Sequence, residues 1–278
     1  MSLNEKLDRV KILMSLSISP EPINEGYREV RELDRLATDI ITWYANANAS
    51  MINRIHKKGF ELLYFNEDMV SLKAAANPED YTILKDFINN SGIYFMLDSE
   101  ISAKGYFQQF LKKITINTLN NEFVNNLQHQ LKHIQSDSET GKINSSDATN
   151  ILKIAMGVGF RGTIIHELQH AYDSMISDGK YVHDAKSQKY YKTINSQTDD
   201  LDSDMSDDER NRYLGLPHEY WARFSEIVNK ENFLQLDVHA AVSKFQREFI
   251  GWKNINLAGK KRLIKSLYKL YDMERTKI

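Results

Sequence analysis

Two histidines spaced by four residues, His166 and His170, could hold one metal ion between them. On a helix this spacing places both side chains on the same face. Two neutral imidazoles and a third ligand leave a zinc ion one coordination position for water, and the ion lowers the pKa of that water toward neutrality. Glu167 lies between the histidines and could take the proton. The pattern His-Glu-x-x-His therefore predicts a zinc-dependent hydrolytic site.

The residues around this motif predict the helix that shared ligation requires. Apolar side chains occur on both sides of the motif, up to Ile176. Glycines mark the expected ends of the helix: Gly157, Gly159 and Gly162 at its start and Gly179 after it. Asp173 would project from the ligand face one turn on, where it could orient a ligand or a backbone group. The competing interpretation is a buried helix whose histidines only satisfy hydrogen bonds.

A third ligand is expected on a second helix further along the chain. A metzincin pattern is excluded, because Ile176 stands ten residues past His166, where that pattern requires a ligand. Pro217 suits the first turn of a helix, where no amide donor is needed, and Glu219 lies two residues further on. The fifty or so residues between the motif and Glu219 are enough for this second helix to fold back across the first and complete a tetrahedral site.

Glu226 and His218 are the rivals of Glu219 for this role. A separation of seven residues places Glu219 and Glu226 on one helix face, so either could reach the metal. We prefer Glu219 as the ligand, with Glu226 as a partner of a ligating histidine. His218 is weaker because adjacent helical residues do not share a direction. Arg223, four residues after Glu219, is read either as an intrahelical ion pair with it or as a clamp on substrate.

The motif residues resemble those of a known family, the gluzincin-type zinc metallopeptidases. The closer likeness is to bacterial toxin and effector metallopeptidases of the anthrax lethal factor type, and it rests on His170-Ala171-Tyr172-Asp173 and Glu219-Tyr220-Trp221-Ala222. The resemblance covers residues 157 to 226 only. It implies a zincin-like fold and, in that fold, a tyrosine near the third ligand that stabilises the oxyanion.

Together these observations predict a zinc-dependent endopeptidase that cleaves specific protein substrates. His166, His170 and Glu219 would bind one zinc ion per chain, Glu167 would activate water, and Tyr213 would assist the oxyanion as the resemblance implies. The resemblance further implies a bacterial effector or toxin-like protease that acts on host proteins. The alternatives are a catalytically silent zincin-fold binding protein and a zinc hydrolase of non-peptide amides.

Composition limits the class of protein without naming a partner. The chain has 278 residues, 41% of them hydrophobic, which is enough for one sizeable core. A net charge of -2 gives no reason to expect nucleic acid, and the absence of cysteine excludes disulfides and thiolate metal sites. Neither a membrane-spanning run nor a cleavable signal is evident, so we expect a soluble protein, either cytoplasmic or exported by a specialised secretion route.

The pattern along the chain predicts an α+β fold: a small mixed sheet, the motif helix and a mostly helical remainder. Residues 1–58 would form an N-terminal helical segment, including one long helix from Val30 to Gly59, packed on a catalytic domain of residues 59–278. Strands are expected at three places: Phe60 to Phe65, Ile93 to Leu97 and Lys113 to Leu119. The last is our choice for the edge strand that an extended substrate would pair with.

Four further segments complete the sequence-based expectations. Residues 122–135 should be helical, and residues 136–150, rich in Ser, Asp and Asn, should form a surface loop. The acidic run from Asp199 to Glu209 fails the EF-hand pattern and is read as a solvated loop, with recognition of a basic substrate segment as the alternative. Near the C-terminus an apolar stripe beside lysines predicts a packed terminal helix rather than a membrane contact.

Overall fold

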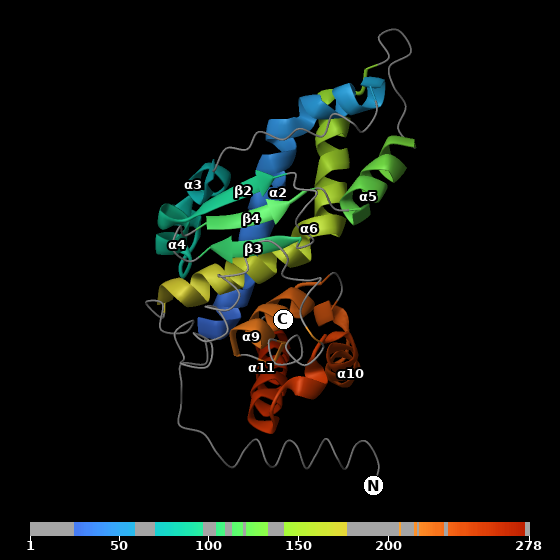
Figure 1. The fold of residues 1–278 in the computed structure, drawn as a ribbon. Coiled ribbons are helices and arrows are strands. Elements are labelled where there is room, and N and C mark those ends of the chain that lie inside the picture. The colour runs from blue at the N-terminus through green and yellow to red at the C-terminus, as the bar shows by residue number, and fades with distance from the viewer. Residues whose placement is uncertain are drawn as a thin grey trace.

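The computed structural model describes residues 25–58, 70–96, 104–108, 113–118, 121–132, 142–176, 206, 214–215, 217–230 and 233–275. Figure 1 shows the arrangement of the helices and strands. The elements follow one another in this order: α2 (Glu25–Lys58), β1 (Val70–Ser71), α3 (Leu72–Ala75), η2 (Pro78–Asp80), α4 (Lys85–Asn90), β2 (Gly92–Met96), β3 (Gly105–Gln108), β4 (Lys113–Asn117), α5 (Asn121–Lys132), α6 (Ser145–Ile176), α9 (Pro217–Val228), η4 (Phe233–Gln235), α10 (Val238–Glu248), η5 (Trp252–Asn254) and α11 (Leu257–Arg275).

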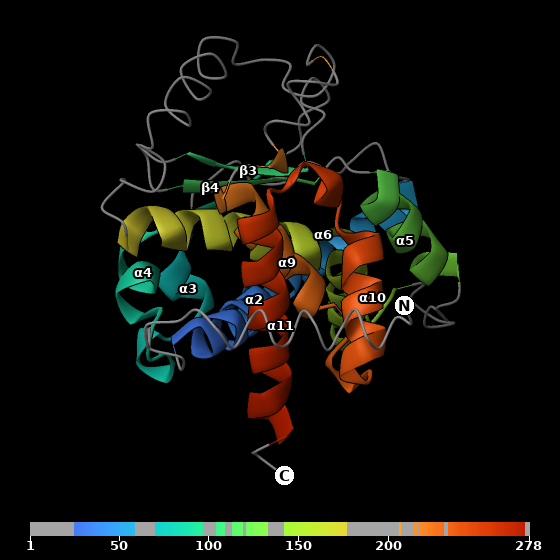
Figure 2. The same ribbon diagram turned by 90° about the horizontal axis from the view of Figure 1, so that it is seen from below.

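The long helix α6 occupies the centre of the fold. It packs against α2, α5, α9 and strands β3 and β4. Figures 1 and 2 show the sheet on one side of α6 and the C-terminal helices α9, α10 and α11 on another. A helix with neighbours on so many sides needs apolar residues around much of its circumference, which is why α6 is rich in Ile, Leu, Met, Phe and Ala.

The four strands that the structure describes form one mixed sheet in the order β1-β2-β4-β3. Strand β2 pairs parallel with β4, whereas β1 and β3 pair antiparallel with their neighbours. The prediction that Lys113–Leu119 is the edge strand is wrong, because β4 lies between β2 and β3. Ile114 and Ile116 enter the core on one face of β4, and Thr115 is also fully buried on the other, as expected for an interior strand. The strand at this edge of the sheet is β3.

The predicted helices agree with the structure except at the start of the motif helix. The long N-terminal helix, the helix from residue 122, the helix opened by Pro217 and the packed terminal helix are all confirmed as α2, α5, α9 and α11. The loop predicted for residues 136–150 is wrong from Ser145 onward, where α6 begins. Its polar residues are tolerated because the first turns of a helix accept Ser, Asp and Asn. The expected strand at Phe60–Phe65 and the acidic run lie outside the described residues.

The buried apolar side chains of the described residues form two clusters. The larger one joins α2, the sheet, α5 and α6, and the smaller one joins α9, α10 and α11. Val30 near the start of α2 belongs to the smaller cluster, although Leu33 and later side chains of α2 belong to the larger. Helices α6 and α9 therefore face each other at the boundary between the two clusters. Among the described residues, no helix is both long and apolar enough to cross a membrane.

The glycines expected at the start of the motif helix lie inside α6 instead. A Cβ atom at Gly159 would lie 3.1 Å from Cβ and 3.2 Å from Cα of Phe123 on α5, so this glycine allows the two helices to approach closely. A Cβ atom at Gly157, in the same helix, would meet nothing within 4 Å. The two positions differ in packing but share a helical backbone.

This difference predicts opposite effects of one substitution. Gly157→Ala should raise the free energy of unfolding by about 0.5–1 kcal/mol, because alanine is favoured over glycine in a helix interior. Gly159→Ala should lower it by about 1–2 kcal/mol, because displacement of the α5 backbone outweighs that gain. Urea unfolding of the two variants and the parent measures both values. Equal effects of the two substitutions would contradict the close approach of α5 and α6.

Candidate metal centre

Helix α6 brings the two histidines of the motif together. His166 Nε2 lies 3.1 Å from His170 Nε2, and the two rings are nearly perpendicular at 86°. Both side chains lie within one continuous helix, so their four-residue spacing places them one turn apart on the same face. The sequence-based prediction that the motif lies within a helix is confirmed.

Helix α9 supplies a carboxylate to the same point. Glu219 Oε2 lies 3.6 Å from His166 Nε2, and Glu219 Oε1 lies 3.3 Å from His170 Nε2. Glu219 is in the first turn of α9, where the partial positive charge of the helix N-terminus favours a carboxylate. Its side chain is 0% exposed, while those of His166 and His170 are 13% and 12% exposed. Solvent therefore reaches this cluster from the histidine side.

The spacing of these three side chains fits a tetrahedral zinc ion. Bonds of about 2.0–2.1 Å at tetrahedral angles separate ligand atoms by about 3.3–3.4 Å. The two Nε2 atoms are 3.1 Å apart, and Glu219 approaches each of them with a different oxygen, Oε1 at 3.3 Å and Oε2 at 3.6 Å, so these separations are close to that value. Among the described residues, His166, His170 and Glu219 form a cluster whose donor atoms all lie within 4.8 Å of one another. Two imidazoles and one carboxylate are donors that zinc accepts, and three protein ligands leave one position for water or substrate.

Glu226 lies behind His166 and faces its other ring nitrogen. Its Oε2 atom is 3.6 Å from His166 Nδ1, so this ring presents Nδ1 to Glu226 and Nε2 to the cluster. A Cβ atom at Gly162, one turn before His166, would lie 3.2 Å from Cγ of Glu226, which shows that glycine makes room for this side chain. Burial raises the pKa of Glu226, but the contact with His166, and after it the positive charge of Arg223, lower that pKa below its ordinary value. The arrangement agrees with Glu219 as the ligand and Glu226 as the histidine partner.

The charges in this cluster are strongly coupled. Burial lowers the pKa of His166, but the carboxylates of Glu219 and Glu226 outweigh burial and raise that pKa to about 10. Burial raises the pKa of Glu219, yet the nearby charges of His170 and His166 bring it well below its ordinary value. Without a metal, a proton on His166 therefore balances the buried carboxylate. A metal cation must displace that proton, so its affinity should rise with pH up to the pKa of His166.

The Glu167 side chain is buried, and its carboxyl interacts electrostatically with the cluster. It is 6% exposed. Burial raises the pKa of its carboxyl, and the charges of His166 and His170 oppose that rise. A carboxyl group whose pKa moves toward neutrality is better matched to accepting and returning a proton near pH 7.

A buried chain of hydrogen bonds joins α6 to α9 beside the cluster. The Ser225 hydroxyl donates to Gln169 Oε1 at 2.6 Å, and Gln169 Nε2 donates to Asp173 Oδ1 at 2.9 Å. Asp173 is thus held next to the motif, with Gln169 as a hydrogen-bond partner. Sequence reasoning missed Gln169 and Ser225, because single uncharged polar residues on helices give no signal until their partner across the interface is known.

Tyr213 lies outside the described residues, so its predicted role stays a prediction. No protein-family model, curated protein or solved structure matches this chain. The resemblance to gluzincins therefore rests on the motif residues themselves and on the geometry that α6 and α9 give them.

The metal content of purified variants distinguishes the two glutamates. The parent protein should hold one zinc ion per chain after dialysis against a weak chelator, and Glu219→Ala should lose it, because two imidazoles alone make an incomplete site. Glu226→Ala should keep a zinc ion with affinity weakened by about 10- to 100-fold, as expected for removal of a carboxylate behind a ligating histidine. Elemental analysis and chelator competition measure these values. Loss of stoichiometric zinc with Glu226→Ala but not with Glu219→Ala would move the third ligand to Glu226.

Proposed function

We propose that this protein is a zinc-dependent endopeptidase. The observation that carries the proposal is the convergence of His166 and His170 of α6 with the buried Glu219 of α9, at separations of 3.1–3.6 Å. The glutamate between the histidines adds a base to a donor set with one open position. Amide hydrolysis is a reaction that uses a Lewis acid, a base and an open position together.

In the proposed reaction, zinc and Glu167 act together. A zinc ion held by His166, His170 and Glu219 would supply Lewis acidity, which would polarise a carbonyl group and lower the pKa of water. Glu167 accepts a proton from the attacking water as its oxygen bonds to the scissile carbonyl carbon. Glu167 then returns that proton to the amide nitrogen as the C–N bond breaks, which yields an amine and a carboxylic acid; the acid ionises by losing its proton to the amine or to solvent. Glu226 keeps the His166 ring oriented throughout.

Strand β3 is the element best placed to align an extended substrate. A Cβ atom at Gly105 of β3 would lie 2.8 Å from Cγ2 of Thr163, and Thr163 is three residues before His166 on α6. Within the described part of the chain, β3 pairs with β4 on one side and with no strand on the other. Backbone pairing along such an edge binds a peptide in extended form. Residues 105–108 thus replace Lys113–Leu119 as the proposed substrate strand.

The proposed substrates are proteins. By analogy with the toxin and effector metallopeptidases that the motif residues resemble, these substrates would be proteins of a host cell. A binding protein without turnover and a hydrolase of non-peptide amides would use the same three ligands. Product analysis separates these two alternatives from an endopeptidase.

Glu167→Gln should abolish hydrolysis while leaving the metal in place. Its amide cannot accept the water proton, so cleavage should fall by about 10²–10⁴-fold at unchanged zinc content. The measurement is mass spectrometry of new N-termini in a mixture of denatured proteins, with and without chelator. Glu79→Gln is the matched control, because Glu79 is an exposed glutamate that pairs with Lys85 and is not a member of the cluster.

Three results would count against this assignment. Cleavage by Glu167→Gln at the parental rate would remove Glu167 from the reaction. A zinc-loaded parent that cuts no protein would favour the binding protein, and cleavage of small amides alone would favour the non-peptide hydrolase.

A further inference from the structure

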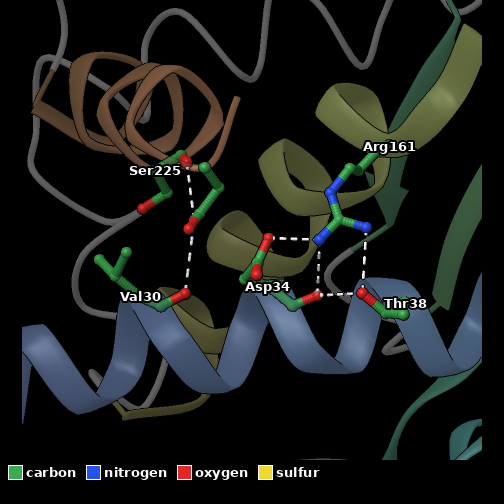
Figure 3. A network of polar contacts seen from close by, with 6 residues as sticks. Val30, Asp34, Thr38, Arg161 and Ser225 are labelled. Carbon is green, nitrogen blue, oxygen red and sulfur yellow. Dashed lines mark hydrogen bonds and ion pairs between the residues drawn. The ribbon is translucent and has the colours of Figure 1, made fainter. Parts of the chain in front are cut away.

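The N-terminal helix α2 is tied by side chains to the helix that carries both histidines. Arg161 of α6 pairs with Asp34 of α2, with Nη2 2.6 Å from Oδ1, and its Nη1 donates to the Thr38 hydroxyl at 3.0 Å. Arg161 Nη2 also approaches the backbone oxygen of Asp34 at 3.4 Å. Figure 3 shows the Arg161 side chain pointing from α6 toward α2, with its guanidinium group next to Asp34 and Thr38. Arg161 is five residues before His166, so this tie is about 7.5 Å along the helix axis from the first histidine.

The same helix α2 is tied to the helix that carries Glu219. Asn229 lies directly after α9, and its side-chain amide donates to the backbone oxygen of Ser225 at 2.9 Å and to that of Val30 on α2 at 3.4 Å. Val30 also packs in the apolar cluster of α9, α10 and α11. Val30, which contacts Asn229, and Asp34, which contacts Arg161, lie one turn apart on α2 (Figure 3).

The hydrogen bond between Ser225 and Gln169 connects the remaining pair of helices, α9 and α6. It joins α9 to α6 at 2.6 Å and is buried at both ends. Helices α2, α6 and α9 are thus connected in pairs: α2 to α6 through Arg161, α6 to α9 through Gln169, and α9 to α2 through Asn229. None of these side chains is a member of the His166, His170 and Glu219 cluster.

We infer that α2 is a positioning element of the metal centre, which holds α9 against α6 so that Glu219 meets the two histidines. The inference rests on the proposed metal centre and adds to it three positioning residues, Asp34, Arg161 and Asn229. The N-terminal helix is then a part of the site's framework rather than an accessory segment.

The geometry of a helix shows why such ties matter. Ser225 is six residues from Glu219, a distance of about 9 Å along α9. A tilt of about 10° around Ser225 would therefore move Glu219 by roughly 1.5 Å, whereas a working site requires placement within about 0.5 Å. The bond at Ser225 alone does not fix the tilt. A second tie at Asn229, on the other side of Ser225 from Glu219, does.

Asn229 also offers a way to separate positioning from stability. Its Oδ1 atom is buried and has no hydrogen-bond partner among the described residues. An unsatisfied buried oxygen lowers the free energy of unfolding, so an apolar side chain of similar size at this position should not destabilise the fold. Replacement of Asn229 should instead weaken zinc binding, because Glu219 would be held less firmly in position.

The test compares Arg161→Met with Arg35→Met in the full chain. Arg35 is the matched control: it also anchors α2, through a hydrogen bond to the backbone oxygen of Asp80 at 2.9 Å and a position 5.0 Å from the Tyr81 ring centroid, but it does not tie α2 to α6 or α9. Zinc affinity is measured by chelator competition, the ligand geometry by the visible absorption spectrum of the Co²⁺-substituted protein, and stability by thermal unfolding.

We expect Arg161→Met to lower the zinc affinity by about tenfold and to change the Co²⁺ spectrum. The zinc affinity of Arg35→Met should stay within about twofold of that of the parent. Asn229→Leu should weaken zinc binding with no fall in the unfolding temperature, and Arg161→Lys should restore part of the affinity lost with methionine. If Arg161→Met does not fold, Asn229→Leu and Arg161→Lys make the same comparison.

Equal zinc affinities and Co²⁺ spectra for the parent, Arg161→Met and Asn229→Leu would overturn the positioning role of α2 and leave the metal centre intact. A parent protein that binds no zinc would contradict the metal centre itself, which is a different result.

Discussion

The burial of the Glu219 carboxylate against two imidazoles is the interaction on which the rest of the structure depends. A carboxylate with 0% exposure cannot keep its charge in an apolar interior without a compensating positive charge. In the metal-free protein His166 supplies it, since the carboxylates of Glu219 and Glu226 hold its pKa at about 10 against the effect of burial. A divalent cation would supply a larger compensating positive charge than a protonated histidine. The same constraint therefore explains why α9 must lie on α6 and why the meeting point is suited to a metal.

The two apolar clusters make this arrangement possible by packing α6 and α9 from opposite sides. One face of α9 contributes Tyr220, Phe224 and Ile227 to the smaller cluster, which leaves Glu219, Ser225 and Glu226 to face other neighbours. Gly162 makes room for Glu226, and the Gln169–Ser225 bond sets the register of the two helices. Helix α2 contributes to both clusters and touches both ligand helices, so the framework of the centre includes residues that are more than 100 positions away from the motif in the sequence.

The sequence predicted the parts of this centre that depend on local spacing. His166 and His170 were recognisable because four residues make one helical turn, and Glu219 because Pro217 marks the start of a helix. The true start of α6 at Ser145 was missed because the glycines at 157, 159 and 162 look like helix breakers, although α5 and Glu226 require two of them as contact points. The edge of the sheet was misassigned because alternating residues in Lys113–Asn117 suggested a half-exposed strand, whereas both faces are covered. Strand order and the ties through Arg161, Gln169 and Asn229 are tertiary facts with no periodic signal.

The most direct measurement is an anomalous diffraction map at the zinc absorption edge, from crystals of the full chain grown with zinc. The account predicts one strong peak per chain, within bonding distance of His166 Nε2, His170 Nε2 and a Glu219 oxygen, with Glu226 next to His166 Nδ1 and outside the bonding shell. A peak bonded to Glu226 in place of Glu219, or no peak between α6 and α9 in crystals whose zinc content is confirmed, would contradict it.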